Sequence, residues 1–236
     1  ELERGVRGLR IALVREGFDR PGSEADVDAT VREAARHLAA AGAEVSEISI
    51  PLHTHGAGIV FIGMIDGALS TFTDLGPYGP NAKGHTPVGG TRFYQAVRRE
   101  RADDMADTVK VTLLFAQAMR NRYGPYYSAR AQNLTRALRA AYDEAFATHD
   151  LLLMPTTIMK AHRIPPPDAA PPQIIGSAFD MLGNTMPFDG TGHPSMSVPA
   201  GLSEGLPVGM MFSGRYGEDD VVLRAGHAVQ QVVRLD

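Results

Sequence analysis

The sequence predicts an α/β fold in which helices flank a central mixed β-sheet. The first observation behind this prediction is a strand, helix and strand in the first fifty residues. An apolar run at 9–14 precedes a helical apolar pattern at 23–42, and a second apolar run follows at 45–50. Such a βαβ unit implies two neighbouring parallel strands and a right-handed crossover.

The other two observations come from the last third of the chain. Residues 151–154 read Leu-Leu-Leu-Met, a short apolar run typical of a buried strand. Apolar runs at 196–198 and 208–212 flank a turn at Glu204-Gly205, so they predict a hairpin or two neighbouring strands. Parallel and hairpin-connected strands together give a mixed sheet.

The pattern divides the chain into three regions. We expect the βαβ unit at 1–52, a helical cover region at 53–150, and the rest of the sheet with a loop on the substrate side at 151–236. Helical spacing and breakers predict helices at 58–72, 93–105, 106–119, 128–148 and 219–233, a loop at 76–90 and a proline-rich irregular segment at 165–172.

Composition excludes several function classes. The 236 residues carry 27 acidic and 23 basic side chains, for a net charge of -4, which argues against a general nucleic-acid binder. There is no cysteine, so disulfides, thiolate catalysis and cysteine-ligated metals are excluded. That composition fits a reducing compartment and predicts a cytoplasmic protein. No uninterrupted apolar run reaches the length of a membrane span, so we expect no membrane association.

Serine and lysine side chains raise the question of nucleophilic catalysis. Ser195 and Ser197 alternate about one residue in a predicted strand and so share a face. The chain has three lysines, Lys83, Lys110 and Lys160, and none lies in a supporting motif. We therefore interpret both serines as residues on a strand face rather than as nucleophiles.

Histidines offer two further candidate sites. His53 and His55 form a close pair without a neighbouring acidic residue, so we expect solvated loop histidines rather than a metal site. Asp189 and His193 lie four residues apart with Thr191 between them. They could act as an acid–base pair, or they could be hydrogen-bonding residues that hold an irregular loop; the second interpretation is favoured.

Three motifs resemble those of the amidase signature family. The stretch 183–201 reads GNTMPFDGTGHPSMSVPAG, close to the family's C-terminal hallmark. It is followed by Gly-Leu-Pro-Val-Gly at 205–209 and by an acidic helix start at 218–220. Upstream, Tyr142, Phe146 and the run 150–157 resemble the helix-to-strand passage of the family. The Thr-Gly-His-Pro form is similar to bacterial amidases of the nitrile-degradation type.

The resemblance implies a specific chemistry, and it also implies that the catalytic residues are absent from this sequence. Amidase signature enzymes hydrolyse carboxamides with a serine nucleophile, a second serine, a lysine base and an oxyanion hole in a glycine- and serine-rich loop, without a metal or cofactor. The loop and the lysine belong to the N-terminal half of the family, and their motifs do not occur in this sequence. The chain therefore resembles the C-terminal portion of the fold and is expected to contain no catalytic residue and no metal site.

The resemblance also assigns a role to the 183–201 stretch. In the family this loop approaches the active site, so we expect it to line or support the substrate pocket. The residues assigned in this way are Asn184, Thr185, Phe188, Asp189, Thr191 and His193.

These inferences give a function with two alternatives. We expect the complete enzyme to hydrolyse a small aliphatic or aromatic amide to an acid and ammonia, with this chain as an inactive fragment that supplies scaffold and pocket. Its expected partners are the amide substrate, the missing N-terminal half and, in a homodimer, a second copy of the chain. The alternatives are a non-catalytic docking or regulatory module on the same scaffold, or a cofactor-free hydrolase that uses Asp189 and His193.

Overall fold

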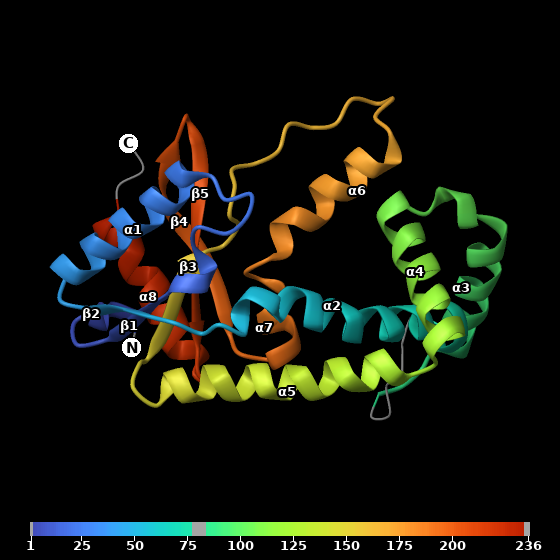
Figure 1. Cartoon of the computed structure of the whole chain (residues 1–236), viewed down its shortest axis with the longest axis horizontal. Helices are drawn as coiled ribbons and strands as arrows, with labels where there is room; N and C mark the ends of the chain where they lie inside the picture. Colours follow the sequence, from blue (N-terminus) through green and yellow to red (C-terminus); the bar gives the residue numbers. More distant parts are fainter. Residues whose placement is uncertain (1, 77–83, 234–236) are drawn as a thin grey trace. The chain divides into compact units, whose positions relative to one another are not determined.

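The computed structural model describes residues 2–76 and 84–233, which fall into two compact units (Figure 1). Unit 1 comprises Glu1–Val60, Asn133–Ile164 and Phe179–Asp236. Unit 2 comprises Phe61–Gln132 and Pro165–Ala178. Each unit is described by itself.

A five-stranded mixed sheet forms the centre of unit 1. Its strands are β1 (Arg10–Val14), β2 (Glu44–Ile48), β3 (Leu151–Pro155), β4 (Ser195–Ser203) and β5 (Leu206–Gly214), in the order β2-β1-β3-β5-β4. β1 pairs in parallel with both β2 and β3, and β5 pairs antiparallel with both β3 and β4. The predicted α/β class, the βαβ unit and the hairpin are confirmed.

Two helices pack on this sheet. They are α1 (Ala25–Ala40), which links β1 to β2, and α8 (Asp219–Val232) at the end of the chain. α8 approaches β4 closely at Gly226, where an added Cβ would lie 3.2 Å from Val198. α1 gives way to a loop at Gly42, whose φ of +102° is a conformation that glycine adopts without strain.

The β4–β5 hairpin closes through the predicted turn. Glu204 and Gly205 have φ angles of 51° and 78°. Two consecutive positive φ angles are the requirement of a type I′ turn, whose twist matches that of the flanking strands. The strand bounds are wider than the apolar runs predicted, because β4 and β5 include the polar residues that alternate with apolar ones.

Two long helices contribute to both units. α2 (His53–Ser70) and α5 (Tyr126–Phe146) each contain residues of unit 1 and of unit 2. Within unit 1, Gly56 of α2 lies against Pro187 and Leu138, which belong to α7 (Met186–Thr191) and α5. An added Cβ at Gly56 would lie 2.9 Å from Pro187, so the missing side chain lets the first turns of α2 approach α7.

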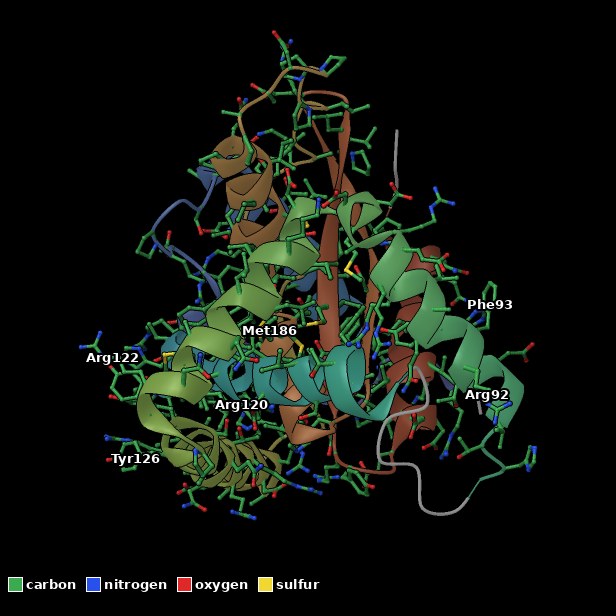
Figure 2. The ribbon with its side chains drawn as sticks, turned by 90° about the vertical axis from the view of Figure 1, so that its right-hand side faces the viewer. Arg92, Phe93, Arg120, Arg122, Tyr126 and Met186 are labelled. Atoms are coloured by element: carbon green, nitrogen blue, oxygen red, sulfur yellow. The ribbon has the colours of Figure 1, made fainter. Side chains whose placement is uncertain are left out.

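Unit 2 is helical and has a small core. It holds α3 (Val88–Glu100), α4 (Asp107–Tyr123), most of α6 (Pro171–Phe179) and parts of α2 and α5. Its buried cluster consists of Ile65, Leu69 and Ala116. Figure 2 shows Phe93 on α3 extending outward from the ribbon, and this ring is 71% exposed. The remaining short helices of the chain are η1 (Leu2–Arg4), η2 (Arg15–Gly17), η4 (Ala102–Asp104), η5 (Asp180–Leu182) and a π-helical turn at Thr71–Leu75.

The helix boundaries depart from the predicted ones in several places. α3 ends at Glu100 rather than at 105, and α4 continues to Tyr123 rather than ending at 119. α2 begins five residues before the predicted start at 58 and therefore contains His53 and His55. Within the predicted loop at 76–90, residues 88–90 already belong to α3, while residues 77–83 lie outside the described residues. α6 begins at Pro171, inside the predicted irregular segment, because a proline is well tolerated in the first turn of a helix.

The segment His53–Thr73 also meets the length and composition of a membrane-crossing helix. Its most apolar window has a mean hydropathy of 1.4, and 22% of that window is buried. Isoleucine, valine, phenylalanine and leucine raise this average, while glycines and Asp66 interrupt the apolar run. Core helices of globular proteins meet the same test, so a single such helix is weak evidence.

Candidate functional site

Asn184 lies where the carboxyl ends of two parallel strands meet. Its side-chain nitrogen donates to the carbonyl of Gly17, just after β1, at 2.9 Å, and to the carbonyl of Pro155, the last residue of β3, at 2.8 Å. Asn184 is 1% exposed. Since ligand sites of open α/β sheets form at the carboxyl ends of the strands, this edge is the candidate site.

His53 and Tyr142 complete a buried network around Asn184. His53 Nε2 lies 3.2 Å from Asn184 Oδ1, and His53 Nδ1 lies 2.7 Å from the Tyr142 hydroxyl. Both rings have no exposed surface. Burial, and secondarily the nearby Arg20 cation, lowers the pKa of His53 to about 4, so this ring is neutral near pH 7. Burial also raises the pKa of the Tyr142 phenol, which keeps its proton.

Arg20 approaches the same amide oxygen from the β1–α1 connection. Its guanidinium donates to Asn184 Oδ1, to the Glu16 carbonyl and to the Thr54 carbonyl, each at 3.3 Å. These acceptors are neutral, and burial lowers the pKa of Arg20. Arg20 therefore brings a positive charge to the candidate site. None of these hydrogen bonds is made to a carboxylate, which would neutralise that charge.

An aromatic cluster supports the short helix α7. The rings of Tyr142 and Phe188 stack with their centroids 4.8 Å apart, and His193 meets Tyr142 edge-on at 5.6 Å. His193 Nδ1 lies 3.0 Å from Thr191 Oγ1, and its Nε2 lies 3.2 Å from Asp143 Oδ1. Burial lowers the pKa of His193 although Asp143 acts to raise it. α5 thus holds α7 and the start of β4 through both stacking and hydrogen bonds.

The structure brings together four of the six predicted pocket residues. Asn184, Phe188, Thr191 and His193 are buried near Tyr142 in unit 1. Thr185 is half-buried, and Asp189 is exposed on α7. His193 does have a structural role, as favoured above, but its acidic partner is Asp143 of α5 rather than Asp189, so Asp189 and His193 form neither the alternative acid–base pair nor the expected pair within one loop.

The expectation that His53 and His55 are solvated loop histidines is wrong. Both residues lie in the first turns of α2, and His53 is fully buried, whereas His55 is exposed. The partners of His53 lie 89 and 131 residues away in the sequence, so no local pattern indicates its role. The local signal for a helix that starts at His53 is Pro51, which breaks the preceding strand, followed by an apolar stretch with helical spacing.

The serines and Lys160 have structural partners. Ser195 shares a hydrogen bond with Ser213 at 2.7 Å, and Ser197 shares one with Thr156 at 2.6 Å. The second pair meets across Gly209, whose missing side chain leaves the space open. Lys160 forms ion pairs with Glu24, Asp26 and Glu204.

These partners matter for the chemistry that Lys160 could perform. Hydrogen bonds to Asp26 and Glu24 raise the pKa of its ammonium group, so Lys160 is held as a cation. A cationic lysine cannot accept a proton from a nucleophile. Ser195 and Ser197 lie on strand β4, as predicted, and are bonded to neighbouring hydroxyl groups.

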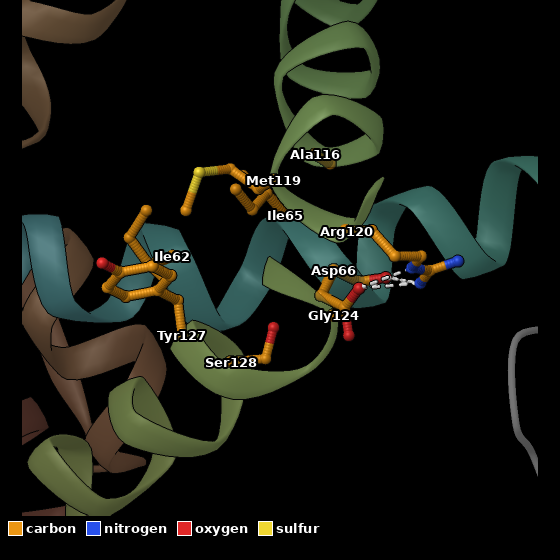
Figure 3. Close-up of a pocket in the computed structure, with 9 residues that line it drawn as sticks. All are labelled: Ile62, Ile65, Asp66, Ala116, Met119, Arg120, Gly124, Tyr127 and Ser128. Carbon is orange, nitrogen blue, oxygen red and sulfur yellow. Dashed lines mark hydrogen bonds and ion pairs between the residues drawn. The ribbon is translucent and has the colours of Figure 1, made fainter. Parts of the chain in front are cut away.

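Two hollows lie away from the predicted pocket residues. In unit 1, a groove of about 320 Å³ lies between the β2–α2 connection and the end of α5; its lining includes Leu52, Glu144 and His149. In unit 2, a small cavity lies beside the ion pair of Asp66 and Arg120 (Figure 3). Within residues 2–76 and 84–233, no group of three or more His, Cys, Asp or Glu side chains could hold a metal ion.

The comparisons with known proteins agree on one family. The family model Amidase matches residues 1–223. An enantioselective amidase of Rhodococcus rhodochrous is 37% identical over 226 residues, which cover 94% of this chain and 44% of that enzyme. A glutamyl-tRNA(Gln) amidotransferase subunit of Rubrobacter xylanophilus is 31% identical over 235 residues, which cover 98% of this chain and 46% of that relative.

A solved structure shows the same fold. The structure of a bacterial aryl acylamidase of the amidase signature enzymes matches with a TM-score of 0.72 at 24% identity, over 98% of this chain and 45% of that one. The chain thus spans about half the length of these three relatives.

Proposed function

This chain belongs to the amidase signature family, and from that premise we propose that the complete protein hydrolyses a small aliphatic or aromatic carboxamide to a carboxylic acid and ammonia. The observation that carries the proposal is the 37% identity with an enantioselective amidase over 94% of this chain. The match to a tRNA amidotransferase is weaker, at 31%. Both relatives are named for chemistry on an amide group.

In this proposal the chain supplies scaffold and pocket, and the catalytic residues lie outside it. Hydrolysis of an amide needs an activated nucleophile and donors for the oxyanion. Ser195, Ser197 and Lys160 have other partners, which supports a nucleophile and a base elsewhere. The segment from Asn184 to His193, at the carboxyl edge of the sheet, is proposed to shape the acyl side of the pocket.

The remainder of the enzyme is the proposed partner of β4. Among the described strands, β2 and β4 form the two edges of the sheet. β2 carries Glu44 and Glu47, and charged side chains on an edge discourage further pairing. β4 carries no charged residue, so the parts of this edge away from Pro199, which has no N–H to donate, are proposed to pair with the N-terminal half of the enzyme. We further propose a cytoplasmic enzyme that uses no cofactor, and a homodimer stays a prediction.

A chimeric enzyme tests this function. The aligned 226-residue segment of the Rhodococcus rhodochrous amidase is replaced by this chain, and ammonia release is measured on aliphatic and aromatic amides. We expect turnover by the chimera and none by the chain alone, whose intact mass is checked in parallel. A folded chimera without turnover would support the alternative of a non-catalytic module. Turnover by the pure 236-residue chain would show that the nucleophile lies within it and would contradict the proposal.

A further inference from the structure

The carbonyl partners of Asn184 determine the directions of its hydrogen bonds. The Gly17 and Pro155 carbonyl oxygens can only accept hydrogen bonds, so the side-chain nitrogen of Asn184 must face them. The side-chain oxygen of Asn184 therefore faces His53 and Arg20, and it can only accept. If the amide were flipped, the side-chain oxygen of Asn184 would face the Gly17 and Pro155 carbonyl oxygens with no hydrogen between them, so this orientation is excluded.

The orientation of Asn184 determines the tautomer of His53. Because Asn184 Oδ1 accepts, Nε2 of the neutral His53 ring must carry the proton. Nδ1 of that ring then has a free lone pair, so the Tyr142 hydroxyl must donate to it over the 2.7 Å contact. One arrangement of protons satisfies Tyr142, His53 and Asn184 together with the carbonyls at the two strand ends.

The surroundings of His53 favour the neutral ring that this arrangement needs. The charged groups acting on it are Arg20 and Glu16, both in the β1–α1 connection, with Arg20 opposing and Glu16 favouring a second proton. From α5 it meets the neutral phenol of Tyr142, and from α7 the apolar ring of Phe188 at a centroid distance of 6.1 Å. Burial, together with Arg20, lowers the pKa of His53 by more than the hydrogen bond to Asn184 and the charge of Glu16 raise it, so the ring stays neutral.

Tyr142 connects this network to the other predicted pocket residues. Its ring stacks on Phe188 and meets the edge of His193, which bonds to Thr191, while its hydroxyl reaches Asn184 through His53. We propose that Tyr142 and His53 are positioning residues for the amidase site, and that they hold the segment from Asn184 to His193 through a single tautomer of His53. This inference rests on the proposed function for its effect on catalysis, but the tautomer itself does not.

The first test measures the tautomer in the chain as it exists. Nitrogen-15 NMR of histidine-labelled protein at pH 7 distinguishes Nε2–H from Nδ1–H, and the His53→Gln variant assigns the signal among the eight histidines. We expect a single Nε2–H form that stays neutral down to about pH 5. Tyr142→Phe, which keeps the ring and removes only the hydroxyl, should keep the Nε2–H form, because Asn184 Oδ1 still accepts from it, but should leave Nδ1 without a donor. A Nδ1–H signal in the unmodified chain would overturn the inference, whatever the variants do.

The second test uses the chimeric enzyme described above. If the Tyr142 hydroxyl positions the pocket segment, Tyr142→Phe should raise KM about tenfold, which corresponds to about 1.4 kcal/mol of binding free energy, with a smaller change in kcat. A purely structural role would lower the active fraction and hence the apparent kcat, leaving KM unchanged. Tyr216→Phe, at a ring that is 66% exposed, is the matched control and should change neither constant.

The outcomes separate the two proposals. If the chimera folds but releases no ammonia from any amide, the proposed function fails, and the NMR result still decides the tautomer. If the chimera is active and Tyr142→Phe leaves KM unchanged, the positioning role fails while the proposed function stands.

Discussion

The two units of the chain bury very different amounts of apolar side chain. The cluster in unit 1 contains the whole of β3 up to Met154, most of β1 and the inner faces of α1 and α8. The cluster in unit 2 contains three residues. Phe93 and Leu114 of unit 2 are each 71% exposed. A sheet covered by helices buries side chains between each pair of layers, whereas a few helices that share a single contact line bury far fewer.

Polar contacts compensate for part of this difference in unit 2. Arg120 of α4 donates to the Asp66 carboxylate of α2 at 2.7 Å and to the Ser70 hydroxyl at 2.8 Å. Such partly exposed contacts contribute about 1 kcal/mol each at most, so they cannot replace a core. From this difference in burial we expect unit 1 to contribute most of the stability of the chain and unit 2 to unfold at a lower free energy.

The largest expected effect comes from truncating an aromatic ring in each unit. Phe212 of β5 is fully buried, so Phe212→Ala should lower the free energy of unfolding by about 3–5 kcal/mol. Phe93→Ala, in the exposed position of unit 2, should change it by less than about 0.5 kcal/mol. Urea unfolding followed by circular dichroism measures both. Similar losses in the two variants would contradict the difference between the units.

Acid should weaken unit 1 through His53. Its pKa in the folded chain is about 4, below the value of about 6.5 in an unfolded chain, so protons bind preferentially to the unfolded state. The stability that the neutral ring contributes is complete above about pH 6.5 and declines by about 3 kcal/mol as the pH falls to 4. Unfolding free energies measured from pH 7.5 to 5 check this, above the range in which the carboxylates titrate.

The control for the acid effect is a variant with a neutral amide. His53→Gln should be less stable at pH 7 but should show a smaller slope between pH 6.5 and 5. His193, whose pKa is also lowered by burial, accounts for the slope that remains. An unchanged slope in His53→Gln would assign the effect to other groups.

A pair of glycine substitutions should have opposite signs in the two units. An added Cβ at Gly190 of α7 would overlap both methyl groups of Val60, so Gly190→Ala should destabilise by about 1–3 kcal/mol. Gly67 of α2 has nothing within 4 Å of an added Cβ, so Gly67→Ala should stabilise the helix by about 0.5–1 kcal/mol. Thermal unfolding compares them, and a loss of stability in Gly67→Ala would reveal a contact on that face of the helix.

The smallest expected effect concerns the ion pair in unit 2. Arg120→Gln removes the charge that faces Asp66, whose side chain is 35% exposed, and should cost about 1 kcal/mol. Arg122→Gln, two residues further along α4, loses only a cation–π contact with Tyr123 and should cost less than about 0.5 kcal/mol. Hydrogen exchange of the α4 amides resolves the two. Equal protection in both variants would mean that the pair does not stabilise α4.

Local sequence patterns predicted the elements of unit 1 better than its site. The apolar runs of β1 and β3 and the turn at Glu204-Gly205 are local signals, and each appears in the structure. The role of His53 depends on Tyr142 and Asn184, which are distant in sequence, so neither periodicity nor spacing could indicate it. The same reason explains why Asp143, rather than the nearby Asp189, binds His193.

The contact between Asn184 and Gly17 also has a consequence for the order of assembly. The two residues lie 167 positions apart, and β3 lies between β1 and β5 in the sheet. During synthesis, β1 and β2 emerge well before Asn184, so the carboxyl edge of the sheet acquires its buried amide only after the 167 residues that separate Gly17 from Asn184 have been made. Contacts of such long range form slowly because loop closure precedes the gain in stability. The pocket segment is therefore expected to become ordered after β1 and β3, and until then the carbonyl groups of Gly17 and Pro155 can form hydrogen bonds only with water or with transient partners.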